Sequence, residues 1–136
     1  MASLTPMIRR RSTMLLVAAL ALGGLAACGG GGGSAKKCPP KVETKTVTGG
    51  AITICASDIK FDVVTIKAQP GPLKVTLVND GAIYHTLKIP NANVELKTNS
   101  GKTDSATVTL SKGTYSFDCT VPGHAAAGMK GKIVVG

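Results

Sequence analysis

From Val42 onward the chain consists of short alternating stretches, and this pattern restricts the fold more than any other feature of the sequence. Strand-like runs recur roughly every 8–12 residues and are separated by turn signals such as 69–72 (QPGP) and 79–81 (NDG). No stretch of helical period interrupts them. The pattern predicts an antiparallel sandwich or barrel, with about eight strands over 51–61, 63–68, 73–78, 83–89, 94–97, 106–110, 114–119 and 130–135.

Aromatic residues are scarce, since the chain has two Phe, two Tyr and no Trp. A predicted domain over 41–136, about 100 residues long, is large enough for one hydrophobic core. That core must therefore be built mostly from Val, Ile, Leu and Ala.

The N-terminal segment has the layout of an export signal. Three arginines, Arg9–Arg11, precede an apolar run of 14 residues, Met14–Ala27. A membrane-spanning helix needs about 20 residues, so the run is too short to span and typical of a secretory signal. A buried hydrophobic helix is the alternative interpretation. We expect 1–27 to be a signal peptide, with Sec and twin-arginine export both open.

The end of this signal, Leu25–Cys28 (LAAC), resembles the lipobox of bacterial lipoproteins. The resemblance implies cleavage before Cys28 and lipid on its thiol, whereas ordinary cleavage after Ala27 would leave a free cysteine. We expect 28–40 to be a lipidated cysteine and a glycine-rich tether; the nine residues of 29–37 span about 16 Å. The protein would then be anchored on the outer face of the cytoplasmic membrane or in the periplasm.

The charge of the mature chain argues against nucleic-acid binding. Without 1–27, the sequence keeps 13 lysines and seven acidic residues, a formal charge of +6. The lysines are scattered, and no arginine or basic-aromatic cluster accompanies them. They indicate either a solvated surface or attraction to an acidic partner or anionic lipid.

The four cysteines divide by role. Disulfides persist outside the cytoplasm, and Cys38 and Cys55 are a plausible pair that would contribute about 3 kcal/mol. With Cys28 assigned to lipid, Cys119 is left without a partner. An unpaired thiol in an oxidising compartment is a liability unless something protects its sulfur.

Four residues of the mature chain have side chains that can bind a metal ion, and strand parity indicates which side of the sheet they face. Strand parity turns His85, Cys119 and Met129 toward the apolar side, while His124 lies in a Pro-Gly loop where parity does not apply. Each alone is explained as a core residue. Together they are both histidines, the one methionine and the one unassigned cysteine of the mature chain, which favours a shared site.

Two imidazoles, one thiolate and a distant thioether are the donors of a blue-copper electron-transfer site. The thiolate suits Cu(I), the imidazoles suit both oxidation states, and the thioether is a weak axial ligand. Zinc is the main rival, but it prefers a fourth strong ligand or a water over a methionine.

At residues 50–136 the chain resembles the cupredoxins. The resemblance lies in two segments, 84–89 (YHTLKI) and 117–135 (FDCTVPGHAAAGMKGKIVV). The C-x4-H-x4-M spacing of the second segment is similar to that of rusticyanin- and sulfocyanin-type proteins. The resemblance implies a Greek-key β-sandwich of about eight strands and one copper per chain. Its implied ligands are His85, Cys119, His124 and Met129.

The sequence departs from the family after the first histidine. Many cupredoxins carry Asn there, and this chain has Thr86. We expect Thr86 and Thr120 to form hydrogen bonds around the ligands. Because parity turns Thr86 away from the core, a local bend would be required.

The resemblance also implies a route for electrons through the solvent-facing edge of His124. Its neighbours are small and would let a partner approach closely, although a tight loop needs small residues too. The expected portal comprises His124, Pro122, Gly123, Ala125, Ala126 and Ala127.

The function implied is a monomeric, membrane-anchored electron carrier and not an enzyme. Its expected partners are redox proteins, a cytochrome or a membrane respiratory or photosynthetic complex, with an acidic docking surface. A copper chaperone or storage lipoprotein is the alternative. An enzyme fragment is disfavoured because no histidine remains for a catalytic copper, and a purely structural sandwich leaves the four residues unexplained.

Overall fold

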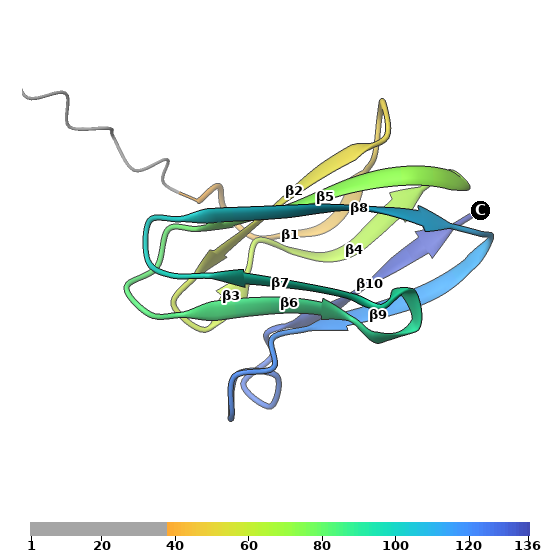
Figure 1. Ribbon diagram of the computed structural model, residues 1–136. Coiled ribbons are helices and arrows are strands. Elements are labelled where there is room, and N and C mark those ends of the chain that lie inside the picture. Colours follow the sequence, from red (N-terminus) through yellow and green to blue (C-terminus); the bar gives the residue numbers. More distant parts are fainter. Residues whose placement is uncertain (1–37) are drawn as a thin grey trace, which may run out of the picture. The chain divides into compact units, whose positions relative to one another are not determined.

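The computed structural model describes residues 38–136, which form two β-sheets packed face to face (Figure 1). One sheet has six strands in the order β1-β4-β10-β9-β6-β7, and the other has four in the order β3-β2-β5-β8. The predicted β-sandwich is thus confirmed. The signal peptide and nearly all of the tether lie outside the described residues, and the domain limits 41–136 stay a prediction.

The strands are short, as their turn-punctuated sequence requires. The six-stranded sheet contains β1 (Val42–Thr46), β4 (Val63–Ala68), β6 (His85–Ile89), β7 (Val94–Thr98), β9 (Gly113–Asp118) and β10 (Lys130–Val135). The four-stranded sheet contains β2 (Ala51–Ser57), β3 (Lys60–Phe61), β5 (Gly71–Asn79) and β8 (Thr103–Leu110). One 3₁₀ turn, η1 (Pro90–Ala92), joins β6 to β7, and within 38–136 no helix has the length and apolarity to cross a membrane.

Apolar side chains from the two sheets meet in one core, because alternate residues of each strand point inward. Phe61 and Phe117 make an edge-to-face contact there, with ring centroids 5.7 Å apart. The rest of the core is aliphatic, as the composition predicts. Burying each Val, Leu or Ile side chain stabilises the fold by roughly 1.5–3 kcal/mol.

Three expectations about the strands are wrong in detail. The run predicted over 51–61 breaks at Asp58, whose φ of 50° turns the chain into the β2–β3 hairpin. The strand predicted over 83–89 begins only at His85, and Ile83 and Tyr84 before it are exposed. The sheets are also not wholly antiparallel, because β1–β4, β4–β10 and β2–β5 pair in parallel.

A disulfide joins Cys38 to Cys55, which confirms the predicted pair. It attaches the start of the described chain to β2. The Cys38 amide also donates to the Asp80 carboxylate over 2.7 Å. Cys38 is therefore held beside the segment that follows β5.

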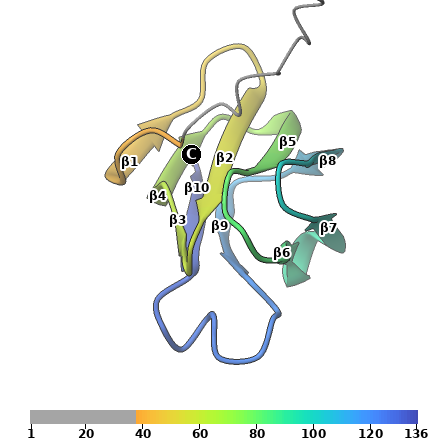
Figure 2. The same cartoon turned by 90° about the vertical axis from the view of Figure 1, so that its left-hand side faces the viewer.

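The loop between β9 and β10 projects from one end of the sandwich (Figure 2). Both strands are central in the six-stranded sheet, so the base of the loop is held firmly. Gly131 pairs with Phe117 at this base. A Cβ at Gly131 would collide with the Phe117 ring and lie 2.5 Å from the Val64 carbonyl oxygen, so the close packing of the base requires glycine.

Candidate metal centre

Four predicted ligand residues come from two places in the chain. His85 is the first residue of β6, and Cys119 directly follows the last residue of β9. His124 and Met129 belong to the loop that leads into β10. Strand β6 pairs with β9 through Lys88 and Asp118, which brings the two segments together.

Backbone hydrogen bonds fold this loop upon itself. The Met129 amide donates to the His124 carbonyl over 3.0 Å, and the Cys119 amide donates to the Met129 carbonyl over 3.0 Å. The His124 amide donates to the Val121 carbonyl over 3.1 Å. The loop therefore holds Cys119, His124 and Met129 as one cluster through its own backbone.

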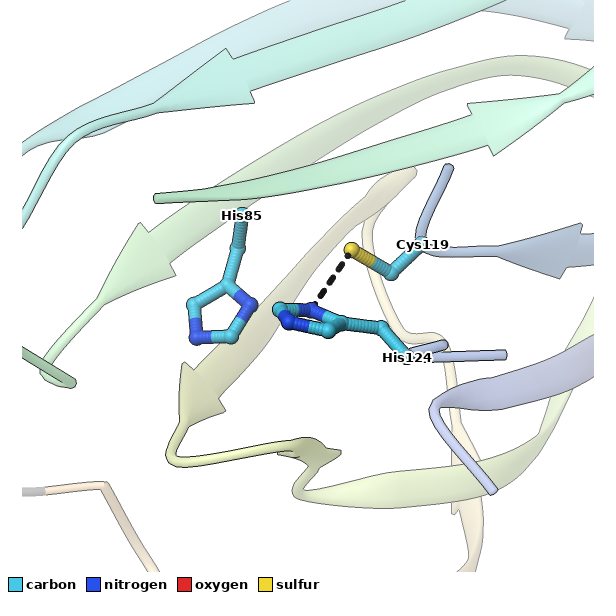
Figure 3. A group of neighbouring side chains, drawn as sticks. All are labelled: His85, Cys119 and His124. Carbon is cyan, nitrogen blue, oxygen red and sulfur yellow. Dashed lines mark hydrogen bonds between the residues drawn. The ribbon is translucent and has the colours of Figure 1, made fainter. Parts of the chain in front are cut away.

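The side chains of His85, Cys119 and His124 converge (Figure 3). One ligand atom from each lies within 4.8 Å of the others, and Cys119 Sγ is 3.4 Å from His124 Nδ1. The two imidazole rings have centroids 5.1 Å apart and are tilted by 53°. All three residues are buried, as is Met129, whose side chain is wholly inaccessible.

The two ring nitrogens of His85 lack the partners that buried polar groups normally have. Among residues 38–136, the two ring nitrogens of His85 are the only buried side-chain nitrogen or oxygen atoms without a hydrogen bond. Cys119 is the free cysteine of the same range, and it is buried too. A buried polar group without a partner is destabilising by roughly 1–3 kcal/mol. A metal ion bound to one ring nitrogen of His85 and to the Cys119 sulfur would explain why these groups are buried together.

The environment of His85 favours the neutral ring that a metal needs. Burial lowers the pKa of His85 from its ordinary value of 6.5, and the nearby His124 lowers it further. The nearby Asp58 acts in the opposite direction and raises the pKa of His85. It does not form a hydrogen bond with either ring nitrogen. Neutral imidazole is the metal-binding form of histidine.

Thr86 and Thr120 form hydrogen bonds around the cluster, as expected. The Thr120 amide donates to Thr86 Oγ1 over 2.7 Å, and the two hydroxyl groups are 2.8 Å apart. The Thr86 amide donates to Cys119 Sγ at 3.4 Å, and the Thr86 hydroxyl lies 3.7 Å from the same sulfur. Each contact places a donor near the thiolate or secures a neighbour that does so.

The expectation that Thr86 needs a local bend is wrong. The pairing of β6 with β7 runs without a bulge from His85 to Ile89, so Thr86 does point away from the core. It is nevertheless buried, because the segment after β9 covers that face and brings Thr120 against it.

The surroundings of His124 are small and mostly open to solvent. Pro122, Gly123, Ala126 and Ala127 are exposed and Ala125 is half-buried, while His124 itself keeps only 7% of its surface accessible. The alanine-rich segment, Ala125–Ala127, belongs to the loop between β9 and β10. Its side chains add little bulk between the imidazole and an approaching surface.

Sequence reasoning missed Asn79, which the NDG motif presented as a turn residue. Asn79 is buried and its side chain bonds the segment before His85. A signal was present, because parity places Asn79 on the inward face of β5 with Leu73, Val75 and Leu77. A polar side chain at an inward position predicts a buried hydrogen-bonding role.

The family model of copper binding proteins of the plastocyanin/azurin family matches residues 48–136, which is most of the chain. The chain belongs to the plastocyanin/azurin family of copper binding proteins. Copper is the cofactor of this family, and the thiolate, two imidazoles and thioether found here are the donors that copper accepts. No curated protein sequence matches the chain.

Solved structures of auracyanins share the fold. Reduced auracyanin from the photosynthetic bacterium Roseiflexus castenholzii has a TM-score of 0.55 at 23% identity, covering 64% of this chain and 97% of its own. Auracyanin B gives 0.56 at 20% identity, covering 71% and 96%. Auracyanin A from the green thermophilic photosynthetic bacterium Chloroflexus aurantiacus gives 0.51 at 24% identity, covering 68% and 100%.

Proposed function

We propose that this protein is a single-domain blue-copper electron carrier with His85, Cys119, His124 and Met129 as its ligands. The main support is the convergence of three buried ligand side chains, of which His85 has no other partner for its ring nitrogens. Copper bound there supplies a one-electron couple between Cu(II) and Cu(I).

The residues of the chain supply the conditions for fast electron exchange. The backbone hydrogen bonds of the β9–β10 loop hold three of the ligands in place. The ligands therefore need to move little when copper changes between Cu(II) and Cu(I). Burial excludes water from the site, and the Thr86 amide stabilises negative charge on Cys119 Sγ. Met129 supplies a thioether that binds weakly.

Addition of Cu(II) to purified 38–136 tests the proposal. An electron carrier gives an intense blue thiolate-to-copper band that disappears on reduction and returns on oxidation, and Cys119→Ser abolishes it. A colourless complex, or one that releases copper on reduction, would instead favour a copper chaperone or storage protein.

Electrons are proposed to enter and leave through the exposed segment around His124. A charged side chain there keeps an apolar partner surface at a distance but does not touch the ligands. Ala126→Glu should therefore slow exchange with the partner and leave the visible spectrum unchanged, and Thr107→Glu on the far sheet is the matched control. An unchanged exchange rate in Ala126→Glu would contradict this route.

The partner is proposed to be an exported redox protein, a cytochrome or a membrane complex, with an acidic docking surface. Support comes from the formal charge of +6 on 28–136. Exchange rates should fall as ionic strength rises, since salt screens such attraction. A rate that rises or stays constant with salt would exclude an acidic docking surface.

Anchoring through lipid on Cys28 is proposed from the LAAC motif and the apolar run before it. The carrier would then act as a monomer at the outer face of the cytoplasmic membrane or in the periplasm. Labelling of the full chain in cells with a palmitate analogue should mark the protein and fail in Cys28→Ala. Equal labelling of both would refute lipidation at this residue.

A further inference from the structure

The side chain of Asn79 connects three backbone segments at the metal end of the sandwich. Its Nδ2 donates to the Ile83 carbonyl over 2.8 Å and to the Thr98 carbonyl over 3.1 Å. Its Oδ1 accepts from the Gly81 amide over 2.9 Å. Asn79 is the last residue of β5 and only 1% of its surface is accessible, so both hydrogens of its amide are used inside the protein.

The groups that Asn79 binds lie on both sides of His85. Ile83 is two residues before His85 in the chain. Thr98 is the residue of β7 that pairs with His85, and its hydroxyl lies 3.4 Å from the His85 carbonyl oxygen. One amide therefore sets the position of the segment that leads into His85 and of the strand that lies beside it.

The segment 80–84, which leads into His85, is also packed closely against the β2–β3 turn. A Cβ at Gly81 would lie 3.0 Å from the Asp58 amide nitrogen, so Gly81 sits directly against the β2–β3 turn. The Asp80 amide donates over 2.9 Å to the carbonyl of Ala56, a residue of β2 just before this turn. The segment 80–84 is held between this turn and the Asn79 side chain.

The other three ligands are supported differently, by the backbone of their own loop and by the Thr86 amide, which donates to Cys119 Sγ. Cys119, His124 and Met129 are joined to one another by the backbone bonds of the β9–β10 loop. His85 stands alone on β6, and its ring makes no hydrogen bond that would orient it. Its distance from the other three depends on where the backbone of 83–85 is placed.

We propose that Asn79 is a positioning residue for the copper site, holding His85 at the distance from the β9–β10 loop that copper requires. The inference rests on the proposed copper function. Asn79 acts through the carbonyls of Ile83 and Thr98 and does not contact the ligands with its side chain. A merely structural role, closing the end of β5, would affect stability but not the metal.

Asn79→Leu tests the proposal, because leucine has the same branching but none of the hydrogen bonds. Cu(II) affinity, measured by competition with a chelator, should fall about 10- to 100-fold, which is typical when support for a ligand is removed. The blue band and the Cu(II) hyperfine splitting should change as well. Asn79→Ser retains one hydroxyl and should change both in the same direction, by less.

Leu110→Ala is the matched control. Leu110 is equally buried and pairs with Gly71, at the opposite end of β5 from Asn79. It should lower stability and leave Cu(II) affinity and the spectrum at wild-type values. Equal copper spectra and affinities in Asn79→Ser and wild type would overturn the proposal, as would a change in Leu110→Ala as large as that in Asn79→Leu.

If Asn79→Leu does not fold, Asn79→Ser decides the matter by itself. Hydrogen exchange in the wild-type apoprotein gives a reading that needs no copper. The Gly81 amide should be protected, because Asn79 accepts from it. An unprotected Gly81 amide would overturn the positioning role, whereas absence of a blue band in wild type would overturn the copper function.

Discussion

Replacing Thr86 by valine should lower the reduction potential of the copper site. Valine keeps the shape of threonine but removes the hydroxyl group. That hydroxyl lies 3.7 Å from Cys119 Sγ and 2.8 Å from Thr120 Oγ1, and it accepts from the Thr120 amide over 2.7 Å. The Thr86 amide bond to the sulfur is part of the backbone and should remain.

The magnitude follows from the charge on the sulfur. A donor near Cys119 Sγ stabilises the reduced site more, because the ligand then carries more negative charge. The hydroxyl is at the outer limit of a sulfur hydrogen bond and is shared with Thr120, so its loss should favour oxidation by roughly 0.5–1 kcal/mol. One electron at 59 mV per 1.4 kcal/mol converts this to a decrease of about 20–40 mV.

Protein-film voltammetry measures the change directly, with Thr86→Ser as the control. Serine keeps the hydroxyl and should retain a potential close to that of wild type. Stability in urea should decrease by about 1 kcal/mol in Thr86→Val, because the partly exposed Thr120 amide loses its acceptor. A potential that rises in Thr86→Val, or that falls equally in Thr86→Ser, would refute the assigned role of the hydroxyl.

The remaining predictions concern the packing at Gly131, the protonation of His85 and the disulfide. Gly131→Ala should destabilise the protein by about 1–3 kcal/mol, because the new methyl group collides with the Phe117 ring; an unchanged urea midpoint would contradict this. The pKa of His85 is lowered in the folded apoprotein, so below pH 6.5 the unfolded chain takes up the proton first. Apoprotein stability should therefore fall as the pH falls, by up to about 1.4 kcal/mol per pH unit, and His85→Gln should remove that slope. The double variant Cys38→Ser, Cys55→Ser should lose about 3 kcal/mol, and equal stability would exclude the entropic contribution of the 17-residue separation.

The sequence by itself determined the fold class and the donor set. Period-two alternation with frequent turn signals permits only β-structure, and the shortage of aromatic residues forces an aliphatic core. Parity and the census of His, Cys and Met identified His85, Cys119, His124 and Met129. These conclusions were accessible because strand direction and residue chemistry are local properties.

Only the tertiary structure decided how His85 meets the loop and what covers the outward face of β6. Parity correctly turned Thr86 outward, but it could not reveal that Thr120, 34 residues further on, buries that face. Asn79 likewise appeared as a turn residue until the structure showed which three backbone groups it binds. Sequence pattern gives the side of the sheet on which a residue lies, whereas its partners depend on strand pairing between distant segments, and this pairing exists only once the sheets have formed.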